Sequence, residues 1–169
     1  MEVLTLGDEQ LRQKALAVKK IDESYQRLAD SMLDILHKQR GVGLAGPQVG
    51  VLERIFVVHV EGDVPRVFIN PSIIETSEAQ LSFEEGCLSV PGVWAELIRP
   101  KIIKVQAWNE RGRPFTIEVG GLLARVIQHE CDHLEGVLFI DHLSEAKRER
   151  LLEKYGNLKL KKLKKKISR

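Results

Sequence analysis

The chain has 169 residues, of which 43% are hydrophobic, enough for one compact domain with its own core and too few for two large ones. Its 26 Lys and Arg residues nearly balance its 24 Asp and Glu residues, and the net charge of +2 favours no particular class of partner. With two cysteines and no apolar run of roughly 18 to 20 residues, the sequence argues against a disulfide-rich scaffold or a membrane protein, and predicts a cytoplasmic one.

The N-terminal part predicts an amphipathic helix. Its apolar residues recur at steps of three and four after Asp22, a favourable N-cap, and the pattern stops at Gly41, a favourable C-cap residue. The glycines of residues 41–50 then predict a stretch whose backbone can bend and be approached closely. The apolar positions of the helix are Ile21, Tyr25, Leu28, Met32, Ile35 and Leu36.

Short strands and a second helix follow. Residues 55–60 and 66–69 are rich in β-branched and aromatic residues, and residues 102–108 and 114–119 predict a β-hairpin. Residues 121–136 predict a helix that ends at Gly136. The fold class is therefore α+β, with short antiparallel and mixed strands surrounding a central helix, an N-terminal helix and a basic C-terminal helix.

The C-terminal tail, residues 159–169, has seven basic residues and no acid. Subtracting these charges from the total of +2 leaves −5 for residues 1–158, which we expect to form a single domain. Leu160, Leu163 and Ile167 recur at helical steps between the lysines, so the tail can form a basic amphipathic helix. A frayed, solvated end fits the same residues equally well.

The central helix contains a metal-binding pattern. His129 and His133 are four positions apart, so both imidazoles fall on one helical face, and Glu130 lies one position round. Cys87 is the best candidate for the third ligand, because a thiolate binds borderline-soft divalent ions well. Three protein ligands leave one coordination position open, which favours a hydrolytic centre over a structural zinc site. A surface helix with two incidental histidines remains the alternative.

Other candidate ligands fit less well. His37 lies in the first helix among polar neighbours, and His59 lies in a predicted strand with no second ligand at helical or turn spacing. Both are interpreted as surface or core histidines. His142 would require the chain to double back beyond Gly136. Cys131 points away from the ligand face by roughly 200 degrees of helical rotation. Cys87 itself could instead be a small buried apolar residue.

Three segments together resemble the signature motifs of the peptide deformylase family. They are Gly41-Val42-Gly43-Leu44-Ala45-Gly46-Pro47-Gln48, Glu85-Gly86-Cys87-Leu88-Ser89 and Gln128-His129-Glu130-Cys131-Asp132-His133. The resemblance implies removal of the formyl group from the formyl-methionine of new polypeptides. At residue 46 the chain departs from the many members that have alanine, a change expected to affect loop stiffness more than chemistry.

The resemblance also implies residue roles. Cys87, His129 and His133 would bind one divalent metal ion, expected to be Fe²⁺ in the cell and replaceable by Zn²⁺, Ni²⁺ or Co²⁺. Glu130 would be the general base and then the acid. The Gln48 side chain and the Leu88 backbone N–H would stabilise the oxyanion, as neutral donors can.

Substrate contacts are expected around the metal. The methionine side chain needs an apolar pocket, whose walls could include Phe83, Leu122 and Val126, although each fits a core position as well. The resemblance suggests that an extended peptide pairs with backbone near Gly43 and Gly86.

Glu85 and Arg99 are hypothesised to form an ion pair that supports the loop of Cys87. The motivation is an acid two residues before the ligand and a base beside Pro100.

The expected partners are N-formyl-methionyl peptides and, through the basic tail, the ribosome, whose surface is rich in RNA. No membrane and no sequence-specific nucleic acid is expected. Two rival functions remain open: another metal-dependent amidase or peptidase with the same His-Glu-x-x-His pattern, and a non-catalytic ribosome-associated domain with a structural metal.

Overall fold

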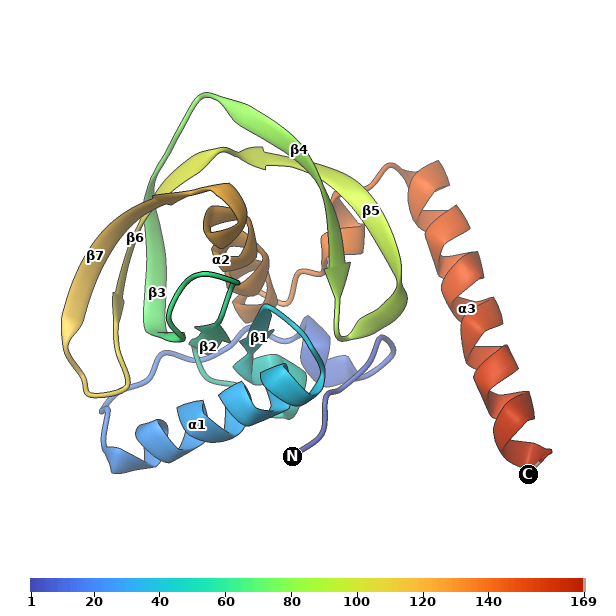
Figure 1. Cartoon of the computed structure of the whole chain (residues 1–169), viewed down its shortest axis with the longest axis horizontal. Coiled ribbons are helices and arrows are strands. Elements are labelled where there is room, and N and C mark those ends of the chain that lie inside the picture. The colour runs from blue at the N-terminus through green and yellow to red at the C-terminus, as the bar shows by residue number, and fades with distance from the viewer. Residues whose placement is uncertain (169) are drawn as a thin grey trace.

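The computed structural model describes residues 1–168, which fold into helices and strands as shown in Figure 1. The α-helices are α1 (Glu23–Lys38), α2 (Gly121–Leu134) and α3 (Glu145–Ile167). Short 3-10 helices are η1 (Glu9–Arg12), η2 (Gly46–Val49) and η3 (Phe139–His142). The strands are β1 (Gly43–Ala45), β2 (Ile55–Val58), β3 (Arg66–Thr76), β4 (Gln80–Cys87), β5 (Val90–Pro100), β6 (Ile102–Trp108) and β7 (Pro114–Gly120).

Two antiparallel sheets surround α2, and this arrangement confirms the α+β prediction. The larger sheet has the order β1-β2-β3-β6-β7, and β4 pairs with β5 in a separate long hairpin. Within residues 1–168, the one parallel pairing is an isolated bridge between Leu16 and Glu53. In Figure 1, α2 lies between the larger sheet and the β4–β5 hairpin, whereas α3 lies outside β5.

Three apolar clusters hold these layers together. The first packs α2 against the larger sheet through residues such as Phe56, Phe68 and Ile127. The second packs α1 beneath β1, β2 and β3, and the third joins the N-terminal segment, β5, η3 and α3. α2 therefore packs against the larger sheet on one side, and its His129 ring stacks 6.1 Å from the ring of Phe139 in η3.

α1 begins as predicted, but its C-terminal cap differs. The Asp22 side chain accepts a hydrogen bond from the Ser24 N–H and caps the helix. The residue in the left-handed conformation is Arg40, with φ of 55°, and not Gly41. The prediction that Gly41 caps the C-terminus of α1 was therefore wrong. Gly41 leaves room for its neighbours, since a Cβ there would lie 2.8 Å from side-chain atoms of both Leu36 and Leu88.

The predicted strands are present with different lengths, and one hairpin was not predicted. β2 is shorter than the predicted strand at residues 55–60, and β3 continues past the predicted end at residue 69 to Thr76. The β6–β7 hairpin lies at the predicted residues. The β4–β5 hairpin pairs Gln80 with Pro100 at one end and Cys87 with Val90 at the other. This hairpin brings Cys87 to α2.

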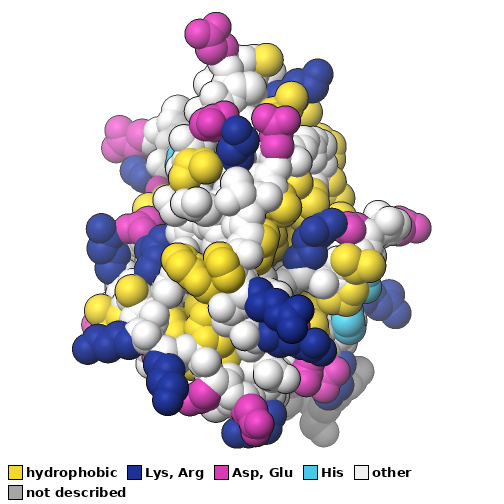
Figure 2. All heavy atoms as spheres, turned by 90° about the vertical axis from the view of Figure 1, so that its left-hand side faces the viewer, with side chains coloured by type: hydrophobic (Ala, Val, Ile, Leu, Met, Phe, Trp, Pro, Cys, Tyr) yellow, Lys and Arg dark blue, Asp and Glu magenta, His cyan; other side chains and the backbone are white. Residues whose placement is uncertain are grey.

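α3 is longer than the basic tail alone. It begins at Glu145 after Ser144, whose side chain caps it, and runs without interruption to Ile167. Leu151 and Tyr155 in its first half are buried, whereas Leu160, Leu163 and Ile167 are exposed. None of the helices in residues 1–168 combines the length and apolar character that a membrane span requires. Seen from the β7 side, positive and negative side chains are interspersed, and apolar side chains gather in a band (Figure 2).

Candidate metal centre and substrate cleft

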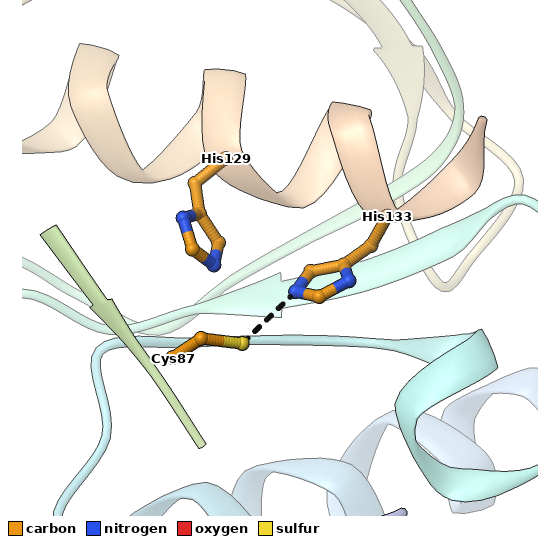
Figure 3. A group of neighbouring side chains, drawn as sticks. All are labelled: Cys87, His129 and His133. Carbon is orange, nitrogen blue, oxygen red and sulfur yellow. Dashed lines mark hydrogen bonds between the residues drawn. The ribbon is translucent and has the colours of Figure 1, made fainter. Parts of the chain in front are cut away.

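Three potential ligands converge between α2 and the end of β4. His129 and His133 project from the same face of α2 toward Cys87 (Figure 3). One ligand atom from each residue lies within 4.8 Å of the others, and the Cys87 Sγ is 3.3 Å from His133 Nε2. Within residues 1–168, this is the one group of three or more such side chains close enough to share an ion.

The orientation of His129 is set by Glu85. His129 Nδ1 lies 2.9 Å from a Glu85 carboxylate oxygen, so with a proton on Nδ1 the other nitrogen is left as a ligand atom. Arg99 donates to both oxygens of the same carboxylate at 2.6 and 2.9 Å. Arg125 donates to it at 2.9 Å. Glu85, Arg99 and Arg125 are all buried, so these charges are neutralised by one another and not by water.

Burial and neighbouring charges decide the protonation of these groups. Burial would raise the pKa of Glu85, but the hydrogen bonds from His129 and the two arginines outweigh it and hold that pKa well below its usual range. Burial also lowers the pKa of His133, and the nearby His129 lowers it further. For His129, contact with Cys87 and Glu85 outweighs burial and raises the pKa well above its usual value. The site thus holds Glu85 as an anion and favours a neutral His133.

The donor set fits one divalent ion. A shared tetrahedral ion would place a sulfur and a nitrogen ligand about 3.5 Å apart, close to the 3.3 Å between Cys87 Sγ and His133 Nε2. A thiolate with two imidazoles suits zinc and the softer divalent transition metals. The contact between His129 and a carboxylate is the supporting interaction that metal-binding histidines usually make.

Glu130 lies beside the ligands with one oxygen unpaired. The residue is buried, and its Oε2 has no hydrogen-bond partner within the described part of the chain. Burial is the main cause that raises the pKa of Glu130 to about 7, and the nearby Glu85 contributes. A Cβ on Gly43 would overlap the Glu130 Oε1 and lie 2.7 Å from Val126 Cγ1, so only glycine leaves the carboxylate its place.

Gln48 is fixed with its amide nitrogen toward the metal ligands. Its Oε1 accepts a hydrogen bond from the Ala45 N–H at 2.8 Å, and its Nε2 lies 3.1 Å from Ser89 Oγ and 3.6 Å from Cys87 Sγ. Two backbone hydrogen bonds from the N-terminal segment hold this region: the Leu4 N–H donates to the Gln48 carbonyl and the Leu6 N–H donates to the Ser89 carbonyl, each at 2.8 Å.

A cleft of about 380 Å³ opens over these residues. The predicted contact residues Gly43, Gly86, Phe83, Leu122 and Val126 all line it, as do Gln48, Cys87, Leu88, His129 and Glu130. Phe83 and Leu122 are exposed, whereas Val126 is buried. The sequence did not single out Arg125, whose guanidinium lies 5.9 Å from the centre of the Phe83 ring, or Trp94, whose indole covers Gly86.

The remaining histidines and Cys131 lie outside the metal group. His37 Nε2 and His59 Nδ1 are 2.8 Å apart, a contact between α1 and the end of β2 that sequence spacing does not reveal. His142 contacts Asp132, which also accepts a hydrogen bond from Arg99. Cys131 packs against the core of the larger sheet.

Gly46 is required by packing and not only by loop stiffness. A Cβ at this position would lie 2.6 Å from the backbone oxygen of Val51 and 3.0 Å from that of Glu53. Backbone atoms cannot move aside as a flexible side chain can, so alanine here would force the loop to shift.

Known proteins of one family are similar to the chain over most of its length. A family model described as polypeptide deformylase matches residues 1–149. The peptide deformylase of Treponema pallidum (strain Nichols) is 43% identical over 159 residues, which cover 94% of this chain and 98% of that protein. The peptide deformylase of Borreliella burgdorferi is 46% identical over 156 residues, which cover 92% and 94%.

Solved structures agree. The crystal structure of peptide deformylase from Ehrlichia chaffeensis matches with a TM-score of 0.91 and 37% identity, covering 96% of this chain and 98% of that one. A structure of the enzyme from that organism in complex with actinonin matches with a TM-score of 0.86 and 39% identity, covering 91% and 94%.

Proposed function

The chain belongs to the polypeptide deformylase family, and from this premise we propose which of its residues remove the formyl group from N-formyl-methionyl peptides. The chain is a metal-dependent hydrolase that acts on these peptides. The observation that carries our assignment is the convergence of Cys87, His129 and His133 beside Glu130, whose Oε2 has no partner among residues 1–168.

Cys87, His129 and His133 would hold the ion. When bound, it polarises the formyl carbonyl and lowers the pKa of water. We propose Fe²⁺ as the physiological ion, with Zn²⁺, Ni²⁺ or Co²⁺ as replacements that the same ligands accept.

Glu130 is assigned as the group that moves the proton. Its carboxylate accepts a proton from the attacking water and then donates it to the amine nitrogen as the formyl carbon–nitrogen bond breaks, which releases formate and a free N-terminus. A pKa of about 7 suits both halves of this transfer near neutral pH. The buried position of Glu130 keeps bulk water from competing for the proton.

Gln48 and Leu88 are assigned as the oxyanion donors. The contact of Gln48 Oε1 with Ala45 fixes which end of the amide lies beside Cys87, and Nε2 donates to Ser89 Oγ and Cys87 Sγ at the wall of the cleft. Leu88 follows Cys87 directly and lines the same cleft, so its backbone N–H is carried by the turn that holds the ligand. Rigid donors of this kind stabilise a developing negative charge without reorganising.

The cleft is assigned to the methionine residue and the peptide that follows it. The Phe83, Leu122 and Val126 side chains provide apolar contacts for methionine, and the backbone near Gly43 and Gly86 can pair with an extended peptide. Such backbone pairing gives affinity with little dependence on sequence, which suits an enzyme that acts on many proteins.

Peptide hydrolysis tests this proposal. The metal-loaded enzyme is expected to release formate from formyl-Met-Ala-Ser and to leave acetyl-Met-Ala-Ser and internal peptide bonds intact. Glu130→Gln is expected to retain the metal and lose turnover. Cleavage of internal bonds would identify another amidase or peptidase, and a fully active Glu130→Gln enzyme would remove Glu130 from the reaction.

We also propose that the enzyme works in the cytoplasm and that the basic end of α3 contacts the ribosome. The support is charge: Lys159, Lys161, Lys162 and Lys164–Lys166 crowd the exposed second half of the helix. Deleting residues 159–169 is expected to weaken ribosome binding in a salt-sensitive manner and to spare turnover of formyl-Met-Ala-Ser. Loss of that turnover would contradict the separation of the two roles.

A further inference from the structure

A second groove adjoins the substrate cleft on the side of α3. It has a volume of about 400 Å³ and lies between β5 and the first half of α3. Val93 and Trp94 line both this groove and the cleft, so the two hollows share a wall. Trp94 is 59% exposed at this boundary, and its indole lies over Gly86 near the end of β4.

The groove has an apolar floor and a positively charged rim. The buried side chains of Val93 and Leu151 form part of its floor. Lys147, Arg150 and Lys154 stand along its α3 side, and Glu96 is the one acid among the lining residues. Within residues 1–168, none of these three cations has a carboxylate within ion-pair distance. Their charges are therefore available to a ligand.

We infer that this α3 groove receives the substrate residues beyond the third and favours acidic side chains there; the inference rests on the proposed function. A peptide held by the cleft continues past its mouth, because each extended residue adds about 3.3 Å. Trp94 offers a flat apolar surface and an indole N–H donor at the crossing point. Beyond it, the aliphatic stems of the lysines and the arginine can pack along the chain while their charged ends meet carboxylates.

Two features favour a binding groove over a lysine-rich helix face that only contacts water: the apolar floor, and the residues shared with the cleft. Such a face does not need an apolar floor, and it does not need to share residues with the cleft. Lys147, Arg150 and Lys154 lie on successive turns of α3, so they follow a strand-like peptide along the groove instead of marking a single point. Contacts of exposed charges are individually weak, so the effect expected is a preference among substrates and not a requirement.

Two matched peptides test the inference. Both begin with formyl-Met-Ala-Ser and end in an amide; one continues with three aspartates and the other with three asparagines. At low salt, kcat/KM for the aspartate peptide is expected to be about 3- to 10-fold higher, through KM, and the difference is expected to shrink as salt is added. Equal values for the two peptides would overturn the inference. Failure to hydrolyse either peptide would instead count against the proposed function.

Charge reversal locates the effect. Arg150→Glu is expected to abolish or invert the preference for the aspartate peptide, and Lys154→Glu gives a second, independent variant. Arg111→Glu makes the same change at an exposed arginine in the β6–β7 turn, outside both hollows, and is expected to keep the wild-type preference. If both groove variants still prefer the aspartate peptide, the α3 groove is not the site that binds its acidic residues. Equal kcat/KM values, together with RNA binding that Arg150→Glu weakens, would assign the groove to a phosphate backbone and reject it as a peptide site.

Discussion

His129 Nδ1 lies 2.9 Å from the Glu85 carboxylate, so the helix that carries two of the proposed ligands is joined to the strand that carries the third. The same carboxylate accepts hydrogen bonds from Arg99 and Arg125. Arg99 also reaches Asp132 on α2 at 2.9 Å. A single buried network therefore sets both the direction of an imidazole and the distance between two structural elements.

Replacing Arg99 with alanine tests this network. The change leaves the buried Glu85 and the half-buried Asp132 with fewer partners, so the free energy of unfolding is expected to fall by about 3–5 kcal/mol. Its metal affinity is expected to fall about 10- to 100-fold, because His129 loses part of its support. Chelator competition and denaturant titration measure the two effects. Arg66→Ala, which breaks the more exposed pair with Asp63, is the matched control. Unchanged metal retention in Arg99→Ala would refute a supporting role.

Much of the helical structure was predictable because its signals are local. The Asp22 cap, the apolar spacing of α1 and the pairing of His129 with His133 each depend on residues within one or two turns. The β4–β5 hairpin gave no such signal, because Trp94 and Ile98 are exposed apolar residues while Glu85 and Arg99 are buried charges. At these four positions the apolar residues face outward and the charged residues inward, the opposite of the usual pattern.

Gly43→Ala tests the close contact with Glu130. The added methyl would overlap the carboxylate and press on Val126, so the variant is expected to lose about 100-fold in kcat/KM, the usual effect of a small misplacement of a catalytic group. Deformylation of formyl-Met-Ala-Ser measures this loss. Gly156→Ala in α3 adds the same methyl where nothing lies within 4 Å. That control is expected to keep its activity and gain about 0.5–1 kcal/mol in stability. Full activity in Gly43→Ala would show that Glu130 has room to move.

The phenol of Tyr25 predicts a pH dependence far from the metal centre. Burial and the hydrogen bond to Glu53, 3.0 Å away, raise the pKa of Tyr25 to about 12. The folded state therefore favours the protonated phenol; its contribution is complete below about pH 10, the ordinary tyrosine value, and is lost as the pH rises toward 12. Tyr25→Phe is expected to cost about 0.5–1.5 kcal/mol at neutral pH.

Alkaline absorbance titration checks the pKa of Tyr25 directly. The chain has two tyrosines, so the titration of Tyr25→Phe reports Tyr155 alone, and its difference from the wild-type curve reports Tyr25. A midpoint near 10 in that difference curve would contradict the raised pKa.

Exposure to air is expected to separate the metal forms. A thiolate ligand beside Fe²⁺ can be oxidised together with the metal, so the iron enzyme is expected to lose activity in air faster than the nickel or cobalt enzyme. Mass spectrometry is expected to find the added oxygen on Cys87. Cys131 provides an internal control, because burial raises its pKa to about 12 and keeps it a thiol. Equal aerobic lifetimes for the three metal forms would refute the prediction.

The sequence predicted which three side chains come together in the candidate metal centre, but it revealed less about their surroundings. Cys87, His129 and His133 lie in short motifs, whereas the partners of Arg125 come from β4 and β5, far away in sequence. A charged residue on a helix usually faces water, and only the fold shows that Arg125 is buried beside Glu85. The contact between His37 and His59 was not predicted either, because the two residues are far apart in the sequence and only the fold brings them together.

The hydrogen bonds of Leu4 and Leu6 tie η2 and the β4–β5 turn to one short segment. Gln48 lies in η2 and Leu88 directly follows β4, so a single N-terminal stretch holds both of the donors proposed for the oxyanion. A protease cut or a bulky fusion partner that displaces this N-terminal stretch is expected to disturb both proposed donors together. Affinity handles for preparing the protein are therefore better attached after α3.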